Sequence, residues 1–234
     1  IYADWRKLYS ALIGGQSGSG KSTLVRNVLA QSALQGGRFV VIDPHIDSGD
    51  ESLAHSLMPL RQLMMVEPAG EDTAVRESLK YVDGIAQARL SGKDQDRTPV
   101  ILVVDELTGL LTRGQVGDEL LDTLGLIAHQ SRKVGVYALA IGQQFQAGIF
   151  PTDVRNSFVS YFSCRTRKDT ARVMSGNTEF AKAAAELTIG QAVWMTPQGE
   201  MHRIAVPDCT EHHLDLVAHT LDGKTWTVGD TSPD

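Results

Sequence analysis

The feature that most constrains the fold is a glycine-rich stretch near the start of the chain. Residues 15–22 read Gly-Gln-Ser-Gly-Ser-Gly-Lys-Ser and match the pattern G-x-x-x-x-G-K-[ST]. An apolar run at Leu8–Ile13 precedes the pattern, and helical periodicity over Lys21–Leu34 follows it. A Gly/Ser linker is the alternative interpretation. The flanking strand and helix favour a phosphate-binding loop instead, because this is the context in which the pattern binds phosphate.

The chemistry of phosphate explains the spacing of this loop. Phosphate oxygens are best held by backbone N–H groups in a concave loop at the positive end of a helix, and glycines let the backbone curl that closely. Lys21 is expected near the β and γ phosphates of ATP, and the Ser22 hydroxyl is expected to bind Mg²⁺. The predicted nucleotide-binding residues are Gly15, Gln16, Ser17, Gly18, Ser19, Gly20, Lys21, Ser22 and Thr23.

Composition limits the remaining possibilities. The 234 residues, 42% hydrophobic, are enough for one α/β domain. Neither a bilayer-spanning apolar run nor a secretory leader is recognised, so we expect a cytoplasmic protein or the cytoplasmic part of a longer one. A net charge of −6 would confine any nucleic-acid contact to a small basic zone. Cys164 and Cys209 lack metal-site spacing and are expected to be buried thiols.

Strand-like and helical patterns alternate through the first two thirds of the chain. They predict an α/β fold with a mostly parallel sheet and helices on both faces. The expected strands are 8–13, 38–45, 63–66, 99–106 and 136–141, and the expected helices include 21–34, 71–90 and one ending near 132–133.

The pattern changes beyond Phe150. Strands are expected at 157–164, 191–196 and 201–206, the last two joined by a hairpin turn, with a helical insert at 169–187. We interpret these segments as a C-terminal β extension of the same sheet. The expected organisation is therefore a lead-in at 1–7, an ATPase domain at 8–207, and a C-terminal helix with a flexible tail at 208–234, disordered from 227 onward.

A second chemical centre is predicted at the ends of two neighbouring strands. Asp105 follows a buried apolar run, where its carboxylate can hold Mg²⁺ together with Ser22, and Glu106 can polarise the attacking water. Gln143, at the tip of the next strand, can contact the γ-phosphate. The alternatives are a solvated strand end for Asp105-Glu106 and an ordinary strand terminus for Gln143.

The order of motifs resembles the FtsK/HerA superfamily of DNA-pumping ATPases. The resemblance covers about residues 8–207 and lies in the phosphate loop and in five later segments: 41–45 (Val-Ile-Asp-Pro-His), 103–106 (Val-Val-Asp-Glu), 132–143, 150–156 and 190–192. Gln144 and Phe145 depart from it, since the family commonly has Arg-Pro there. The resemblance implies a RecA-like P-loop NTPase core that hydrolyses ATP.

The resemblance also implies a homo-oligomeric ring, usually a hexamer, around double-stranded DNA. It assigns phosphate and metal binding to Lys21 and Ser22, metal to Asp105, water to Glu106 and γ-phosphate sensing to Gln143. Arg132 is the first candidate for a cation acting on a neighbour's ATP, and Arg155 is the second. Arg132 could equally complement its helix terminus.

Two DNA-contacting loops follow from the same resemblance. They are 91–98, with Lys93 and Arg97, and 108–117, with Arg113. Few cations suffice where several copies line a ring. The expected function is translocation of double-stranded DNA. The alternatives are an ATPase of a secretion or conjugation apparatus, a viral genome-packaging ATPase, and a slow nucleotide-gated switch.

Overall fold

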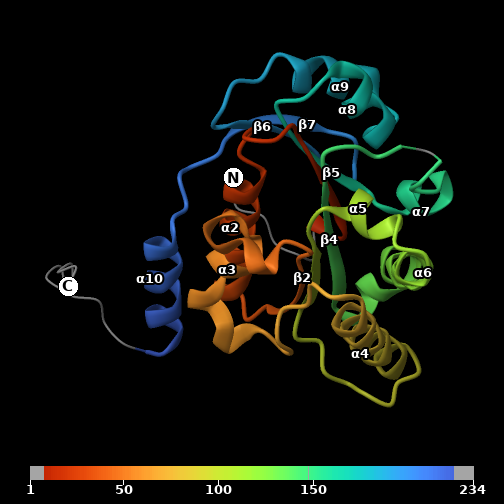
Figure 1. Ribbon diagram of the computed structural model, residues 1–234, viewed down its shortest axis with the longest axis vertical. Helices are drawn as coiled ribbons and strands as arrows, with labels where there is room; N and C mark the ends of the chain where they lie inside the picture. The colour runs from red at the N-terminus through yellow and green to blue at the C-terminus, as the bar shows by residue number, and fades with distance from the viewer. Residues whose placement is uncertain (1–7, 147, 224–234) are drawn as a thin grey trace, which may run out of the picture.

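A seven-stranded, mostly parallel sheet forms the centre of the protein (Figure 1). The computed structural model describes residues 8–146 and 148–223. The strand order is β2-β3-β4-β1-β5-β6-β7; the first five strands are parallel, and β6 and β7 join antiparallel. The strands are β1 (Ala11–Gly14), β2 (Arg38–Ile42), β3 (Val100–Val104), β4 (Val136–Gly142), β5 (Ser160–Cys164), β6 (Gln191–Met195) and β7 (Met201–Ala205). The predicted α/β class and the antiparallel extension are both confirmed.

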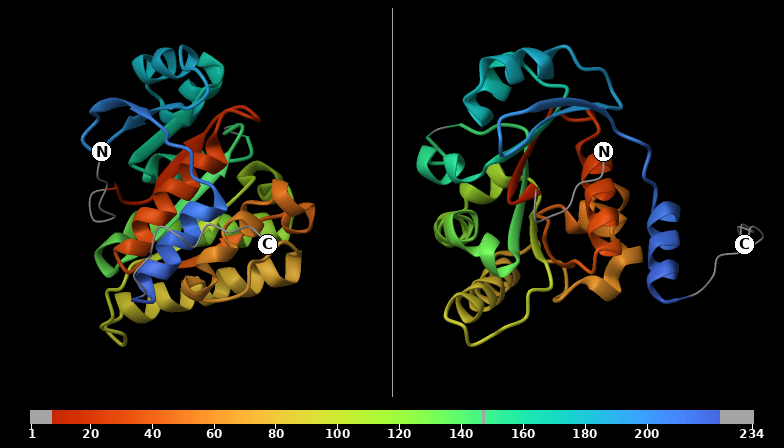
Figure 2. Two further views of the ribbon diagram at one scale, coloured as in Figure 1. Left: turned by 90° about the vertical axis from the view of Figure 1, so that its left-hand side faces the viewer. Right: turned by 180° about the vertical axis from the view of Figure 1, so that it is seen from behind.

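Helices cover both faces of the sheet, which is why the central strands are apolar throughout. On one face lie α2 (Lys21–Leu34), α3 (Leu53–Ser56) and α10 (Glu211–Leu221); on the other lie α4 (Asp72–Leu90), α5 (Leu107–Leu111), α6 (Gln115–Gln130) and α7 (Thr152–Ser157). The right-hand view of Figure 2 shows the sheet between these layers. Every residue of β3 and β4 is buried, as expected for strands packed on both faces.

The parallel strands give the sheet two chemically different edges. Their carboxyl ends, where β1, β3, β4 and β5 stop, form what we call the carboxyl edge, and the opposite side is the amino edge. Helices α8 (Lys168–Ser175) and α9 (Thr178–Ala185) lie beyond the carboxyl edge, at the top of Figure 1. A Cβ on Gly14 would lie 2.7 Å from the Met174 sulfur, so α8 packs directly on the end of β1.

One of the sequence-based predictions is corrected. The expected strand at 63–66 is instead the end of a 3₁₀ helix, η2 (Met58–Leu63), followed by isolated bridges from Met64 to Phe39 and from Ala69 to Ile42. Pro68 lies between the bridges and has no N–H to donate, so the segment cannot pair continuously with β2.

The expected helical insert at 169–187 is present and consists of two helices. Gly176 takes φ of +68°, which ends α8, and the Asn177 side chain accepts a hydrogen bond from the Phe180 N–H to begin α9. Residues 1–7 and the tail from 227 onward lie outside the described residues, so the lead-in and the disordered tail stay predictions.

Candidate functional site

The predicted phosphate loop lies at the carboxyl edge, between β1 and the start of α2. Gly18 and Gly20 take φ of +67° and +97°, a region that glycine enters without strain. Gly15 is required for a different reason, because a Cβ there would lie 2.5 Å from the Ser19 hydroxyl and 3.0 Å from the Cys164 Cβ. The loop conformation therefore depends on its glycines.

Lys21 points back into this loop. Its ammonium donates to the Gln16 carbonyl at 2.9 Å, and the Ser19 hydroxyl donates to the same oxygen at 2.7 Å. Burial lowers the pKa of Lys21, while the negative charges of Asp105 and Glu106 act in the opposite direction. Ser17, Gly18 and Ser22 are exposed, so the rim of the loop is open to a ligand.

Asp105 and Glu106 follow β3 at the same edge. Burial raises the pKa of Asp105 to about 6, and the neighbouring Asp43 carboxylate adds to the shift. The Glu106 N–H donates to the Asp105 carboxylate at 3.0 Å, and Glu106 takes φ of +47°, rare for a residue with a side chain. This backbone geometry turns the chain sharply between the two carboxylates.

The donor set suits Mg²⁺ held jointly with a nucleotide. Ser22 and Asp105 offer hard oxygen ligands, and a cation would relieve the unfavourable burial of the Asp105 charge. Within the described residues no three His, Cys, Asp or Glu side chains form a metal cluster. Mg²⁺ takes few protein ligands and completes its shell with water and phosphate oxygens.

The prediction of site residues did not include Asp43. Asp43 directly follows β2 and is fully buried. Its carboxylate accepts hydrogen bonds from Ser52 Oγ at 2.7 Å and from the N–H groups of Ala54 and His45 at 2.9 and 2.8 Å. Asp43 therefore anchors the turn after β2 and sets the negative field around Asp105. The available signal was a carboxylate directly after the apolar strand Arg38–Ile42; its place beside Asp105 depends on the strand order.

Gln143 lies just beyond β4, next to β3 in the sheet, as expected. Its side chain is exposed and makes no hydrogen bond to any described residue. The adjacent Gln144 carbonyl accepts from the Thr108 hydroxyl at 2.6 Å, which links this strand end to α5. Gln143 is thus accessible to a ligand at the carboxyl edge.

The two arginines proposed to act on a neighbour's ATP lie in different environments. Arg132, in the short helix η3 (Ser131–Val134), precedes β4 and so lies at the amino edge, exposed, with its guanidinium 5.0 Å from the centre of the Tyr9 ring. Arg155 is buried and donates to the Phe145 carbonyl at 3.1 Å and to Thr152 Oγ1 at 3.2 Å. Arg155 is engaged within its own chain, whereas Arg132 is accessible.

The structure does not bring the three DNA-contact candidates together. Lys93 and Arg97 lie in the loop after α4, at the amino edge, while Arg113 follows α5 at the carboxyl edge. Arg113 donates to the Gly70 carbonyl at 3.1 Å and to Asp72 at 3.2 Å.

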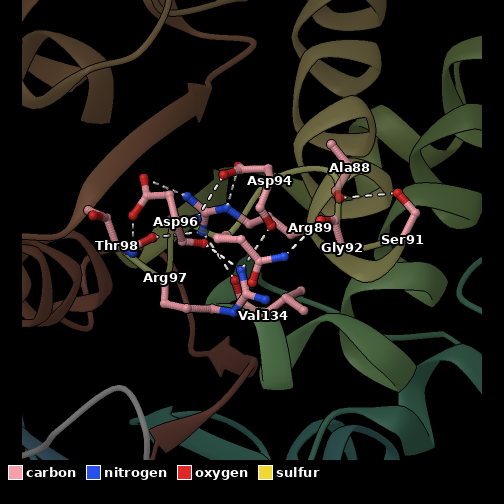
Figure 3. A network of polar contacts seen from close by, with 10 residues as sticks. Ala88, Arg89, Ser91, Gly92, Asp94, Asp96, Arg97, Thr98 and Val134 are labelled. Carbon is pink, nitrogen blue, oxygen red and sulfur yellow. Dashed lines mark hydrogen bonds and ion pairs between the residues drawn. The ribbon is translucent and has the colours of Figure 1, made fainter.

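The loop with Lys93 and Arg97 is fixed by a buried arginine. Arg89, 3% exposed, donates to the Thr98 and Val134 carbonyls and pairs with Asp94 and Asp96 (Figure 3). Lys93 is exposed at the tip of this ordered loop.

Another pair of cations beside the phosphate loop escaped sequence analysis. Arg165 follows β5 directly, and its carbonyl accepts the Gln16 N–H at 3.0 Å. Arg165 and Arg167 are both exposed. The signal was available in the sequence Arg165-Thr166-Arg167, because it follows an apolar strand, but the pairing of β5 with β1 was not.

Two simpler expectations concern thiols and the membrane. Cys164 and Cys209 are free and buried, as predicted, and burial raises the pKa of Cys164 to about 11. In the described ranges, none of the helices combines the length and the apolar character needed to cross a bilayer.

Comparison with solved structures identifies proteins of the same fold. The pCW3 conjugation coupling protein TcpA, in a monomer form with ATPγS, matches with a TM-score of 0.73 at 20% identity, over 94% of this chain and 67% of that one. Thermomonospora curvata EccC (ATPases 2 and 3), in complex with a signal sequence peptide, matches with 0.67 at 19% identity, over 89% and 38%.

A viral protein gives a third match. The genome packaging NTPase B204 of Sulfolobus turreted icosahedral virus 2, in complex with AMPPCP, matches with a TM-score of 0.54 at 14% identity, over 83% of this chain and 95% of that one. No protein-family model and no curated protein matches the sequence. The chain spans about two thirds of TcpA and well under half of EccC. These likenesses confirm the fold that the FtsK/HerA resemblance implied.

Proposed function

We propose that this chain is an ATP-hydrolysing motor domain that moves double-stranded DNA through a homo-oligomeric ring, with six copies as the expected number. One observation carries the proposal: the phosphate loop, Lys21, Asp105 and Glu106 converge at the carboxyl edge, close enough for both carboxylates to shift the pKa of Lys21. Three proteins of the same fold support it: TcpA and B204, both bound to ATP analogues and described as conjugation and packaging proteins, and EccC, described as a type VII secretion ATPase.

The residues divide the work of hydrolysis. The loop N–H groups and Lys21 hold the phosphates, and an incoming phosphate replaces the Gln16 carbonyl as the partner of the Lys21 ammonium. Ser22 and Asp105 would hold Mg²⁺, which would supply positive charge at the phosphate oxygens. Glu106 orients and polarises the attacking water, and Gln143 contacts the γ-phosphate.

The position of Arg132 supports assembly into a ring. It lies at the opposite edge of the sheet from its own phosphate loop, so its guanidinium can reach an ATP only on another copy. A ring in which the amino edge of one copy faces the carboxyl edge of the next provides that contact. Repetition of Lys93, Arg97 and Arg113 around the ring lets an acidic subunit hold DNA in the cytoplasm.

The experiment is ATP hydrolysis by the full chain with Mg²⁺, with and without linear duplex DNA. We expect DNA to stimulate turnover, and we expect Lys21→Ala to lower turnover by roughly 100-fold or more. Lys93→Ala combined with Arg97→Ala should reduce stimulation while leaving DNA-free turnover unchanged. A wild-type protein without Mg²⁺-dependent hydrolysis would contradict the proposal.

A secretion ATPase is the second candidate, favoured by the likeness to EccC in complex with a signal sequence peptide. It predicts hydrolysis that no DNA stimulates, together with binding of a secretion-signal peptide. A packaging ATPase would translocate DNA as the first proposal states and would differ in requiring a capsid.

A further inference from the structure

The last residues of β5 are joined to the phosphate loop itself. β5 pairs in parallel with β1, with Ser163 opposite Gly14, so the two strands end together at the carboxyl edge. Beyond this pair, the Gln16 N–H donates to the Arg165 carbonyl at 3.0 Å. The same Gln16 supplies the carbonyl that holds the Lys21 ammonium. Arg165 is therefore one backbone hydrogen bond away from the residue that positions Lys21.

The packing beneath the loop makes this attachment rigid. A Cβ on Gly15 would lie 3.0 Å from the Cys164 Cβ, so the residue before Arg165 is in close contact with the loop. On the other side, the Thr166 N–H donates to the Ala184 carbonyl of α9. The backbone of residues 164–166 is thus held between the phosphate loop and α9.

The side chains of Arg165 and Arg167 are unusual among the arginines at this edge and in the core. Arg89, Arg113 and Arg155 have their guanidinium groups hydrogen-bonded to carbonyls or carboxylates. Arg165 and Arg167 are exposed, and neither side chain has a hydrogen bond or an ion pair with a described residue. Two exposed cations therefore follow the end of β5, Arg165 on the backbone that is bonded to the loop and Arg167 two residues on, at the start of α8.

We propose that Arg165 and Arg167 bind the phosphates of a nucleotide held by the phosphate loop of the same chain. The proposal rests on the ATP site described above and identifies residues that act in cis, in contrast to Arg132 of a neighbouring copy. The physical reason is charge: a triphosphate carries several negative charges, and the single ammonium of Lys21 neutralises only part of them. Guanidinium groups supply the missing positive charge.

The test is nucleotide affinity, measured by displacement of a fluorescent ATP analogue with ATP, ADP and AMP. The variants are Arg165→Ala, Arg167→Ala and the double variant, with the charge-removing Arg→Gln pair as a second set. The matched control is Arg203→Ala. Arg203 lies on β7 and is also exposed, but its guanidinium lies 3.4 Å from the Glu186 carboxylate. Circular dichroism and thermal melts check that each variant is folded.

We expect the double variant to bind ATP at least 10-fold more weakly than wild type, ADP several-fold more weakly and AMP equally, because the loss should scale with phosphate charge. Arg203→Ala should match wild type. The measurement is made at a protein concentration where sedimentation shows monomers, so that only contacts within one chain count.

Three results would overturn the proposal. The first is an ATP affinity of the double variant within two-fold of wild type, while Lys21→Ala loses ATP binding. This would show that the ATP site exists and that the two arginines are not part of it. The second is a loss that occurs only when the protein is oligomeric, which would place the arginines in a neighbour's site. The third, wild-type protein that binds no ATP, would overturn the ATP site as well.

Discussion

At the scale of single residues, the carboxyl edge keeps charged groups in unfavourable surroundings. Burial lowers the pKa of Lys21 and raises that of Asp105, and Asp43 lies fully buried beside them. Side chains with pKa values shifted in this way are characteristic of functional sites. The loop glycines are constrained by space and by backbone conformation, so each has a separate physical reason to be glycine.

Gly15→Ala should disable the phosphate loop. Its Cβ would approach the Ser19 hydroxyl to 2.5 Å, so the loop must shift away from the geometry that holds phosphate. We expect ATP affinity to fall by roughly 10-fold or more, given the sensitivity of such sites to small displacements. The control is Gly84→Ala in α4, where a Cβ meets nothing within 4 Å. That variant should gain about 0.5–1 kcal/mol in unfolding free energy and bind ATP normally.

Asp105 should make the metal-free protein less stable as pH rises. Its folded-state pKa is about 6 against an ordinary 3.8, so between these values the folded state keeps a proton that the unfolded chain has released. The unfolding free energy therefore falls across this window, by up to about 3 kcal/mol, and levels off above it.

Asp105→Asn removes this titration. Urea unfolding in the presence of a chelator should show the variant to be more stable than wild type at pH 8 and no more stable near pH 4. A stability difference that is the same at both pH values would refute the assignment. With Mg²⁺ present, the variant should lose hydrolysis.

At the scale of elements, neighbouring strands bring sequence-distant residues together. β1, β3 and β4 end at one edge and supply the phosphate loop, Asp105-Glu106 and Gln143, while α4 and η3 end at the other edge with Lys93, Arg97 and Arg132. Sequence periodicity predicted most of these elements because their apolar faces are regular. It failed at 63–66, where Pro68 interrupts pairing. The helical insert at 169–187 was predicted, but the break at Gly176 between its two helices was not.

Arg89→Met should loosen the loop at 91–98. Removing the buried guanidinium leaves the Thr98 and Val134 carbonyls and two aspartates without their partner (Figure 3). We expect a loss of about 2–4 kcal/mol in unfolding free energy, the range for breaking one side of a buried polar network. Lys93→Ala, on the exposed tip, should change stability by less than about 0.5 kcal/mol. Equal effects of the two changes would contradict the anchoring role.

At the scale of the whole molecule, the residues of the proposed site lie at opposite edges of the sheet. One copy carries the phosphate loop at its carboxyl edge and Arg132 at its amino edge, so the proposed role of Arg132 requires two copies in contact. Neither edge alone predicts this arrangement.

Mixing two inactive variants should restore hydrolysis if Arg132 acts between copies. Lys21→Ala cannot hold phosphate but keeps Arg132, and Arg132→Ala keeps its phosphate loop. Each alone should have turnover reduced by roughly 100-fold or more, and a mixture should exceed the sum of its parts because mixed contacts pair an intact loop with an intact arginine. Activity of the mixture equal to that sum would place Arg132 outside the site.

The sequence alone determined the class of fold and the phosphate loop. Both depend on local patterns: glycines at fixed spacing, apolar strands that end in Asp105-Glu106 or Gln143, and helices with regular apolar faces. Only the tertiary structure decided the strand order, which places Arg165 beside Gln16, Asp43 beside Asp105 and Arg132 at the far edge. The reason is physical: periodicity records which side of an element is buried, whereas strand neighbours are chosen by packing between segments far apart in the chain.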